Sequence, residues 1–221
     1  MGGSIHMKVA LLCLFILAAA CNVWACAVNR QKLRAAAKAL LMPLLAAIYL
    51  LQAKEPNALV LTALGFGWLG DLFLIDPNRI VLRMSGVAAF LIGHGFYLAA
   101  MITHFAPEPQ LWMWFPGIGA PAAAAAVLYF RVSPVMPREM KLPGAGYFLA
   151  LAAVNAVSAL VLLSGCAGGT ALMAGFALFL ASDTVLCRQF FTVGHPAPKH
   201  DVAVMTTYIL AQSCIILAFV I

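Results

Sequence analysis

The sequence predicts an all-α integral membrane protein, a bundle of eight transmembrane helices. Of its 221 residues, 65% are hydrophobic and only 9% are charged, whereas soluble domains carry about 25% charged residues. The apolar residues gather in stretches close to the length of about 20 residues that crosses a bilayer. Lipid cannot satisfy exposed backbone groups, and the alternation of barrel strands is absent, so the spans are predicted to be helices. The same composition excludes a disordered chain.

Eight apolar stretches, each bounded by proline, glycine or charged residues, are the predicted spans. They cover residues 7–28, 36–52, 57–75, 80–103, 111–130, 144–163, 169–190 and 202–221. The second is short for a span, and the others have the usual length. No soluble domain, long linker or internal repeat separates them, so residues 7–221 are predicted to form a single eight-span transmembrane domain.

The first stretch also has features of a signal peptide, with Lys8 as the basic region and small residues near Cys21 as a cleavage site. Its apolar core extends beyond the usual signal length, and Arg30, Lys32 and Arg34 follow it closely. This order of charges favours an uncleaved span. The opening residues MGGSIHM resemble a cloning remnant, so residues 1–6 are predicted to be extraneous to the native chain.

The positions of the basic residues predict the topology. Eleven of the thirteen lysines and arginines fall in or beside the connections after the first, third, fifth and seventh spans. They are Arg30, Lys32, Arg34, Lys38, Arg79, Arg83, Arg131, Arg138, Lys141, Arg188 and Lys199. Only Lys8 and Lys54 lie on the other side. Because basic loops stay in the cytoplasm, both termini are predicted to be outside, and we expect the protein in a bacterial inner membrane.

Two aspartates lie within predicted spans, where an ionised side chain costs about 2.5–3.5 kcal/mol on insertion scales. Asp71 is near the end of the third stretch, and Asp183 is past the middle of the seventh. Both stretches run from outside to inside, so both carboxyls are predicted to lie in the cytoplasmic half of the bilayer. They are therefore candidate functional residues. The alternative is that each caps a helix or pairs with Arg79, Arg83 or Lys38.

Two further polar residues, His94 and Tyr97, lie in the fourth stretch. Their spacing of three places them on one helical face with Phe90 and Met101. A lone histidine on an apolar helix is more often a hydrogen-bonded core residue than a catalytic one, and that alternative stays open here.

Some patterns point away from other classes of protein. The net charge of +6 comes without a basic run interleaved with aromatics, so no nucleic-acid partner is predicted. Gly65, Gly67 and Gly70 match the dinucleotide motif GxGxxG, but that motif requires a βαβ unit around it. In a spanning helix these glycines are predicted to form a smooth packing face that delivers Asp71 into the bundle, and Gly93 and Gly95 to do the same around His94.

The order of several motifs resembles the YhhN-like lysoplasmalogenases. The motifs are Gly70-Asp71 in the third span, Phe90, His94 and Tyr97 in the fourth, Ser182-Asp183 in the seventh, and Tyr208 and Gln212 in the last. Lys38 and Pro43 resemble the family's second helix, although the two are usually closer together there. The resemblance extends over essentially the whole chain.

This resemblance implies hydrolysis of the vinyl ether bond of lysoplasmalogens to a fatty aldehyde and glycerophosphocholine or glycerophosphoethanolamine. A protonated carboxyl would donate a proton to the β-carbon, and an ionised one would stabilise the oxocarbenium ion and guide water, as two carboxyls do in glycosidases. Asp71 and Asp183 are the predicted catalytic residues, with Asp183 the preferred donor. The predicted substrate-binding residues are His94, Tyr97, Tyr208 and Gln212, together with Lys38 and Arg188 at the phosphate. The scheme calls for no metal or other cofactor.

Two alternatives belong to other functional classes. A transporter or lipid-binding protein would use Asp71 and Asp183 as a proton or cation relay, and it predicts an inverted internal repeat, which the sequence lacks. A metal-dependent lipid hydrolase would use His94 and the aspartates as ligands, but such sites usually need more histidines at membrane depth than this chain offers.

Overall fold

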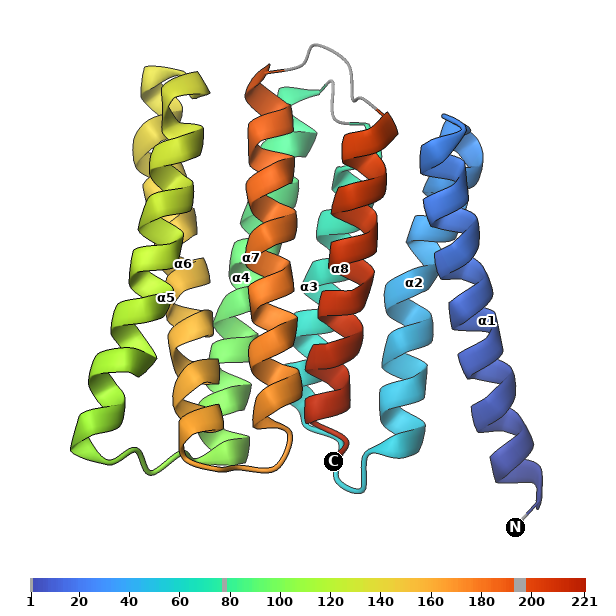
Figure 1. Cartoon of the computed structure of the whole chain (residues 1–221). Coiled ribbons are helices and arrows are strands. Elements are labelled where there is room, and N and C mark those ends of the chain that lie inside the picture. The colour runs from blue at the N-terminus through green and yellow to red at the C-terminus, as the bar shows by residue number, and fades with distance from the viewer. Residues whose placement is uncertain (1, 77–78, 193–197) are drawn as a thin grey trace.

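The computed structural model describes residues 2–76, 79–192 and 198–221, with side chains from residue 5 onward, and these residues form a bundle of eight α-helices (Figure 1). The helices are α1 (Gly2–Ala27), α2 (Gln31–Gln52), α3 (Ala58–Phe73), α4 (Ile80–Phe105), α5 (Leu111–Val132), α6 (Arg138–Leu163), α7 (Gly169–Thr192) and α8 (Pro198–Ala218), with a 3-10 turn, η1 (Ser133–Val135), after α5. The described residues contain no strand. The predicted fold class, an all-α polytopic membrane protein, is confirmed.

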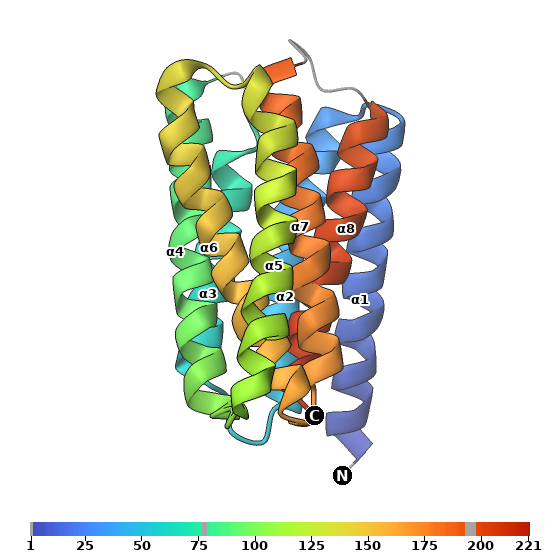
Figure 2. The same ribbon diagram turned by 60° about the vertical axis from the view of Figure 1, so that its left-hand side comes forward.

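Seven of the described helices are long and apolar enough to cross a bilayer, and α3 is the shorter one. Its 16 residues give a length of about 24 Å, compared with the roughly 30 Å of a hydrocarbon core. The predicted third span of 57–75 is therefore too long, because the chain leaves the helix at Leu74. Both views nevertheless show α3 running beside α4 through the bundle (Figures 1 and 2).

Four helices begin earlier than the apolar stretches predict, α1 at Gly2, α2 at Gln31, α6 at Arg138 and α8 at Pro198. The first turns of α2 and α6 carry Arg34 and Glu139, and a hydropathy criterion excludes such residues although an interfacial helical turn accepts them. The early start of α2 matters for function, because it places Arg34 and Lys38 on the same helix.

Six of the eight described helices form a core, and the other two, α1 and α5, lie at its periphery. Helix α1 packs against α2 and α8, and α5 packs against α6 and α7. These two have the smallest buried share of the seven long helices, 28% for α1 and 22% for α5. Their exposed leucine, isoleucine, valine and phenylalanine side chains form the kind of surface that faces lipid. Trp112 and Trp114 are exposed at the start of α5, where aromatic residues anchor helices at a membrane interface.

The chain ends lie at one end of the bundle, and α1, α3, α5 and α7 all run toward the other end (Figure 1). This arrangement agrees with an even number of traversals. It places the starts of α2, α4, α6 and α8, which carry most of the basic residues, together at the end opposite the termini.

We expect that end to be cytoplasmic. A reporter fused after Ile221 should be active only when it is a type that works outside the cytoplasm, and fusions within 131–143 should show the reverse. Cytoplasmic activity of a reporter at Ile221 would contradict the eight-span topology.

Glycines allow α3 and α4 to approach closely, beside Asp71 at Gly70 and about two helical turns away at Gly93. A Cβ atom on Gly70 would lie 2.8–3.0 Å from the ring of Phe90, and one on Gly93 would lie 3.3 Å from the carbonyl oxygen of Ala63. The predicted packing role is confirmed for these two glycines. It is wrong for Gly65 and Gly95, where an added Cβ atom would meet nothing within 4 Å, so both face away from the contact.

Candidate active site

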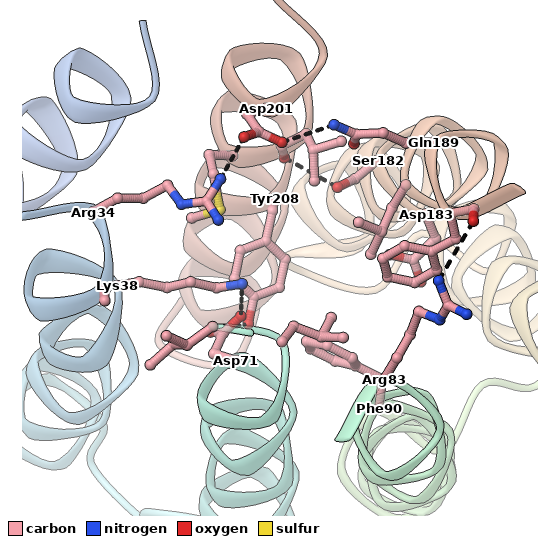
Figure 3. Close-up of a pocket in the computed structure, with 17 residues that line it drawn as sticks. Arg34, Lys38, Asp71, Arg83, Phe90, Ser182, Asp183, Gln189, Asp201 and Tyr208 are labelled. Carbon is pink, nitrogen blue, oxygen red and sulfur yellow. Dashed lines mark hydrogen bonds and ion pairs between the residues drawn. The ribbon is translucent and has the colours of Figure 1, made fainter. Parts of the chain in front are cut away.

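A polar cavity of about 240 Å³ opens between five helices at the end of the bundle opposite the termini (Figure 3). Its charged residues are Arg34 and Lys38 from α2, Asp71 from α3, Arg83 from α4, Asp183 from α7 and Asp201 from α8. The cavity therefore gathers both predicted catalytic aspartates in one site.

Helical periodicity explains which residues of each helix reach the cavity. Helix α7 contributes Ser182, Asp183, Leu186, Gln189 and Phe190, and α8 contributes Asp201, Val204, Met205 and Tyr208. Both sets follow spacings of three, four and seven residues, which form one stripe along a helix. Each stripe combines apolar residues that pack with neighbouring helices and polar residues that face the cavity.

Asp71 is held by partners from two other helices. Its side chain is buried, and its Oδ1 atom lies 3.2 Å from the Nζ atom of Lys38. The hydroxyl of Tyr208 donates a hydrogen bond of 2.9 Å to Oδ2. A buried carboxylate is stable only when it is paired and hydrogen-bonded, and Lys38 and Tyr208 meet both conditions. These contacts are suited to an ionised Asp71.

Asp183 has a different environment. It is 6% exposed, and the hydroxyl of Tyr147 on α6 donates a hydrogen bond of 2.5 Å to its Oδ2 atom. No described cation forms an ion pair with it. A carboxyl group with a neutral donor and no cation is suited to the protonated form, which keeps an O–H group to donate.

An apolar groove of about 80 Å³ adjoins the polar cavity between α4, α6 and α7. The two cavities share Leu74, Phe90, Asp183, Leu186 and Phe190. The groove also reaches Pro143, which is exposed near the start of α6. Asp183 is the acidic residue common to both linings, so it lies where a polar compartment meets an apolar one.

A hydrogen-bonded network forms part of the wall of the polar cavity. Arg34 forms an ion pair with Asp201, and the amide of Gln189 donates a hydrogen bond of 2.8 Å to the other oxygen of Asp201 (Figure 3). The hydroxyl of Ser182 donates a hydrogen bond of 3.0 Å to the carbonyl oxygen of Val204 and so joins α7 to α8. These contacts fix the stripes of α7 and α8 relative to α2.

Residues 33–219 match the model of the YhhN family. The chain belongs to the YhhN family. All the residues of the site lie within the matched range, and α1 lies before it. Neither the comparison with curated proteins nor that with solved structures gave a match.

The other predicted site residues of this YhhN-family chain lie at different distances from the cavity. Lys38 and Tyr208 line it. Gln212 lies one helical turn beyond Tyr208, is buried, and accepts a hydrogen bond of 2.7 Å from the hydroxyl of Tyr97. Gln212 and Tyr97 do not line the cavity, so they belong to the packing around it and not to its wall.

His94 is buried and also lies outside the cavity lining. Its Nδ1 atom is 2.7 Å from the carbonyl oxygen of Phe90, and its ring packs edge-on against Phe179 at a centroid distance of 4.6 Å. Its Nε2 atom has no hydrogen-bond partner among the described residues. The packed ring supports Phe90, which lines both cavities.

Arg188 is the predicted residue that the structure separates from the others. It is exposed and absent from the lining of both cavities. Five residues of helix correspond to a rotation of about 140°, so Arg188 and Asp183 point to different sides of α7. The cations that line the cavity are instead Arg34, Lys38 and Arg83.

Several site residues were missed in the sequence. Tyr147, Asp201 and Gln189 carry no motif that marks them, because their partners come from other helices. Arg34 could have been predicted, because it precedes Lys38 by four residues and so lies on the same face of the helix. Among the described residues, no three histidine, cysteine, aspartate or glutamate side chains gather into a metal-binding group.

Proposed function

We propose that this YhhN-family protein is a lysoplasmalogenase, a hydrolase that cleaves the vinyl ether bond of lysoplasmalogens. The observation that supports this most is the position of Asp183, at the boundary between the polar cavity and the apolar groove. A lysoplasmalogen has its vinyl ether at the corresponding boundary, between the apolar chain and the polar glycerophospho head. With the chain in the groove and the head in the cavity, the reacting bond lies beside the carboxyl of Asp183.

In the proposed mechanism Asp183 is the proton donor. Its hydrogen bond from Tyr147 occupies Oδ2, which leaves the other oxygen to carry the proton. Transfer of that proton to the β-carbon of the vinyl ether converts the α-carbon and ether oxygen into an oxocarbenium ion. A positioned acid of this kind is worth about 10²–10⁴ in rate.

Asp71 serves as the ionised carboxylate in the same scheme. The ion pair with Lys38 and the hydrogen bond from Tyr208 keep it charged in a buried position. Its remaining lone pairs accept a hydrogen bond from water and direct that water toward the oxocarbenium carbon.

The steps balance without a co-reactant other than water. Water adds to the α-carbon, and its proton returns to the Asp183 carboxylate. The resulting hemiacetal then collapses: its hydroxyl proton passes to the glycerol oxygen as the bond between that oxygen and the former vinyl carbon breaks. The products are a fatty aldehyde and the glycerophospho alcohol, and both aspartates return to their starting states. We expect this reaction in the cytoplasmic half of a bacterial inner membrane.

Substrate selectivity tests the proposal. The purified protein should release aldehyde from a lysoplasmalogen and release no product from the saturated ether analogue, because only the vinyl ether can form an oxocarbenium ion by protonation at carbon. The saturated analogue should inhibit competitively. Aldehyde and fatty acid are measured in parallel.

Rapid release of fatty acid from an acyl lysophospholipid would instead identify an ordinary lipase. Proton movement across proteoliposomes without aldehyde release would favour the relay alternative. Loss of turnover with a chelator, restored by a divalent metal, would contradict the two-aspartate scheme.

A further inference from the structure

The charges of the polar cavity leave one cation without an ionic partner. Three cations and three carboxyls line it, and two pairs are formed, Lys38 with Asp71 and Arg34 with Asp201. Asp183 takes a hydrogen bond from a tyrosine instead of a cation. Arg83 therefore has no ion pair with a described carboxylate.

Arg83 is nevertheless held in place. Its guanidinium carbon lies 5.4 Å from the ring centroid of Phe190, and Nη1 lies 3.4 Å from the carbonyl oxygen of the same residue. Its Nε atom is buried and has no hydrogen-bond partner among the described residues. An arginine has five donors in a planar fork that matches a phosphate group, and with the described residues Arg83 forms one side-chain hydrogen bond.

Arg83 lies on the same side of the cavity as Asp183, the proposed proton donor. It lies two helical turns before Phe90 on the same face of α4, and both residues line the polar cavity. Figure 3 shows Arg83 on the side of the cavity where Asp183 lies, across from Lys38 and Asp71. With Asp183 protonated, as the proposed mechanism requires, the cavity carries one net positive charge. Arg83 is half-buried, and a positive charge withdrawn from water without a counter-ion is costly, so an anionic ligand would offset that cost.

We infer that Arg83 binds the phosphodiester of a lysophospholipid head group, and that this contact makes the protein specific for phosphate-bearing lipids. The inference deepens the proposed function and rests on it for the identity of the lipid. It assigns the phosphate to Arg83 in place of Arg188, which lies outside the cavity, and Lys38, whose charge is taken by Asp71. The vinyl ether then lies between the phosphate at Arg83 and the apolar groove.

Two substrates, one with the phosphate-bearing head group and one without it, test this assignment by turnover. One is a lysoplasmalogen, and the other is the 1-O-alkenylglycerol with the same chain and no phosphate. For Arg83→Gln, kcat/KM on the lysoplasmalogen should fall by about 10–100-fold, because a hydrogen bond to a charged group is lost. The loss should lie mainly in KM, since the phosphate contact is the same before and during reaction. Turnover of the alkenylglycerol should change little.

Arg131→Gln is the matched control, because Arg131 is exposed at the end of α5 on the same end of the bundle. It should behave like the unaltered protein on both substrates. Arg83→Lys keeps the charge without the fork and should recover part of the affinity. Equal losses on both substrates in Arg83→Gln, or no loss on either, would overturn the inference.

Binding measured without turnover separates this inference from the proposed reaction. Calorimetry with the non-hydrolysable saturated ether lysophospholipid should show affinity about 10–100-fold weaker in Arg83→Gln than in Arg131→Gln. If no aldehyde forms from either lipid while this difference holds, the proposed reaction fails and the phosphate site stands. Inorganic phosphate that binds as tightly as the lipid, and equally depends on Arg83, would contradict a head-group site and indicate a site for free phosphate.

Discussion

Asp183→Asn and Asp71→Asn should each lower aldehyde release from lysoplasmalogen by about 10²–10⁴-fold, the usual worth of a positioned acid or base. Asparagine at position 183 keeps the shape and can still accept from Tyr147, but it has no proton to give to carbon. Asparagine at position 71 cannot carry the negative charge that guides water. Affinity for the saturated ether analogue should change less, because the lipid chain supplies much of the binding.

Glu139→Gln is the control for these variants, since Glu139 is an exposed carboxylate near the start of α6. It should keep full turnover. The double variant of Asp71 and Asp183 should be scarcely slower than either single variant, because residues that act as one unit are not additive. A well-folded single variant that retains more than roughly a tenth of the activity is too active for this mechanism, and the assignment of that aspartate would then have to be withdrawn.

The sequence was sufficient to predict the helices, because the bilayer imposes a length and an apolar composition on each of them. It was less accurate at their ends. The apolar stretches predict starts of α2, α6 and α8 that are too late, because the polar residues of a first turn lower its mean hydropathy. The early turns of α2 carry Arg34 and Lys38, so this error falls on a part of the chain that lines the cavity.

The buried acids were also predictable, because an ionisable residue in lipid is costly and therefore conspicuous. Their partners were harder to predict. Tyr147 and Asp183 are 36 residues apart, and Arg34 and Asp201 are 167 apart, so only the packing of the helices reveals these pairs. The sequence allowed two interpretations of the aspartates, a functional role or pairing with a cation such as Lys38. The structure contains that pair, between Lys38 and Asp71.

Pairing and function are compatible at Asp71. A buried carboxylate needs a cation to remain charged, and in the proposed mechanism that charge is the useful property. In that mechanism Lys38 would act through the carboxylate of Asp71, with which it forms an ion pair. A stability measurement can separate this role of Lys38 from a direct contact with the substrate.

Lys38→Met should lower the free energy of unfolding in detergent by about 3–5 kcal/mol, because it leaves the Asp71 charge buried without its cation. The double variant Lys38→Met/Asp71→Asn removes both charges and should recover most of that stability while remaining inactive. Arg79→Met is the control, since it breaks an ion pair whose side chains are 75% and 46% exposed, and such surface pairs contribute little. Unfolding is followed by denaturant titration, and turnover by aldehyde release.

A double variant as unstable as Lys38→Met would show that the ion pair is not what stabilises this part of the bundle. A double variant with restored turnover would show that the charge of Asp71 has no part in the reaction.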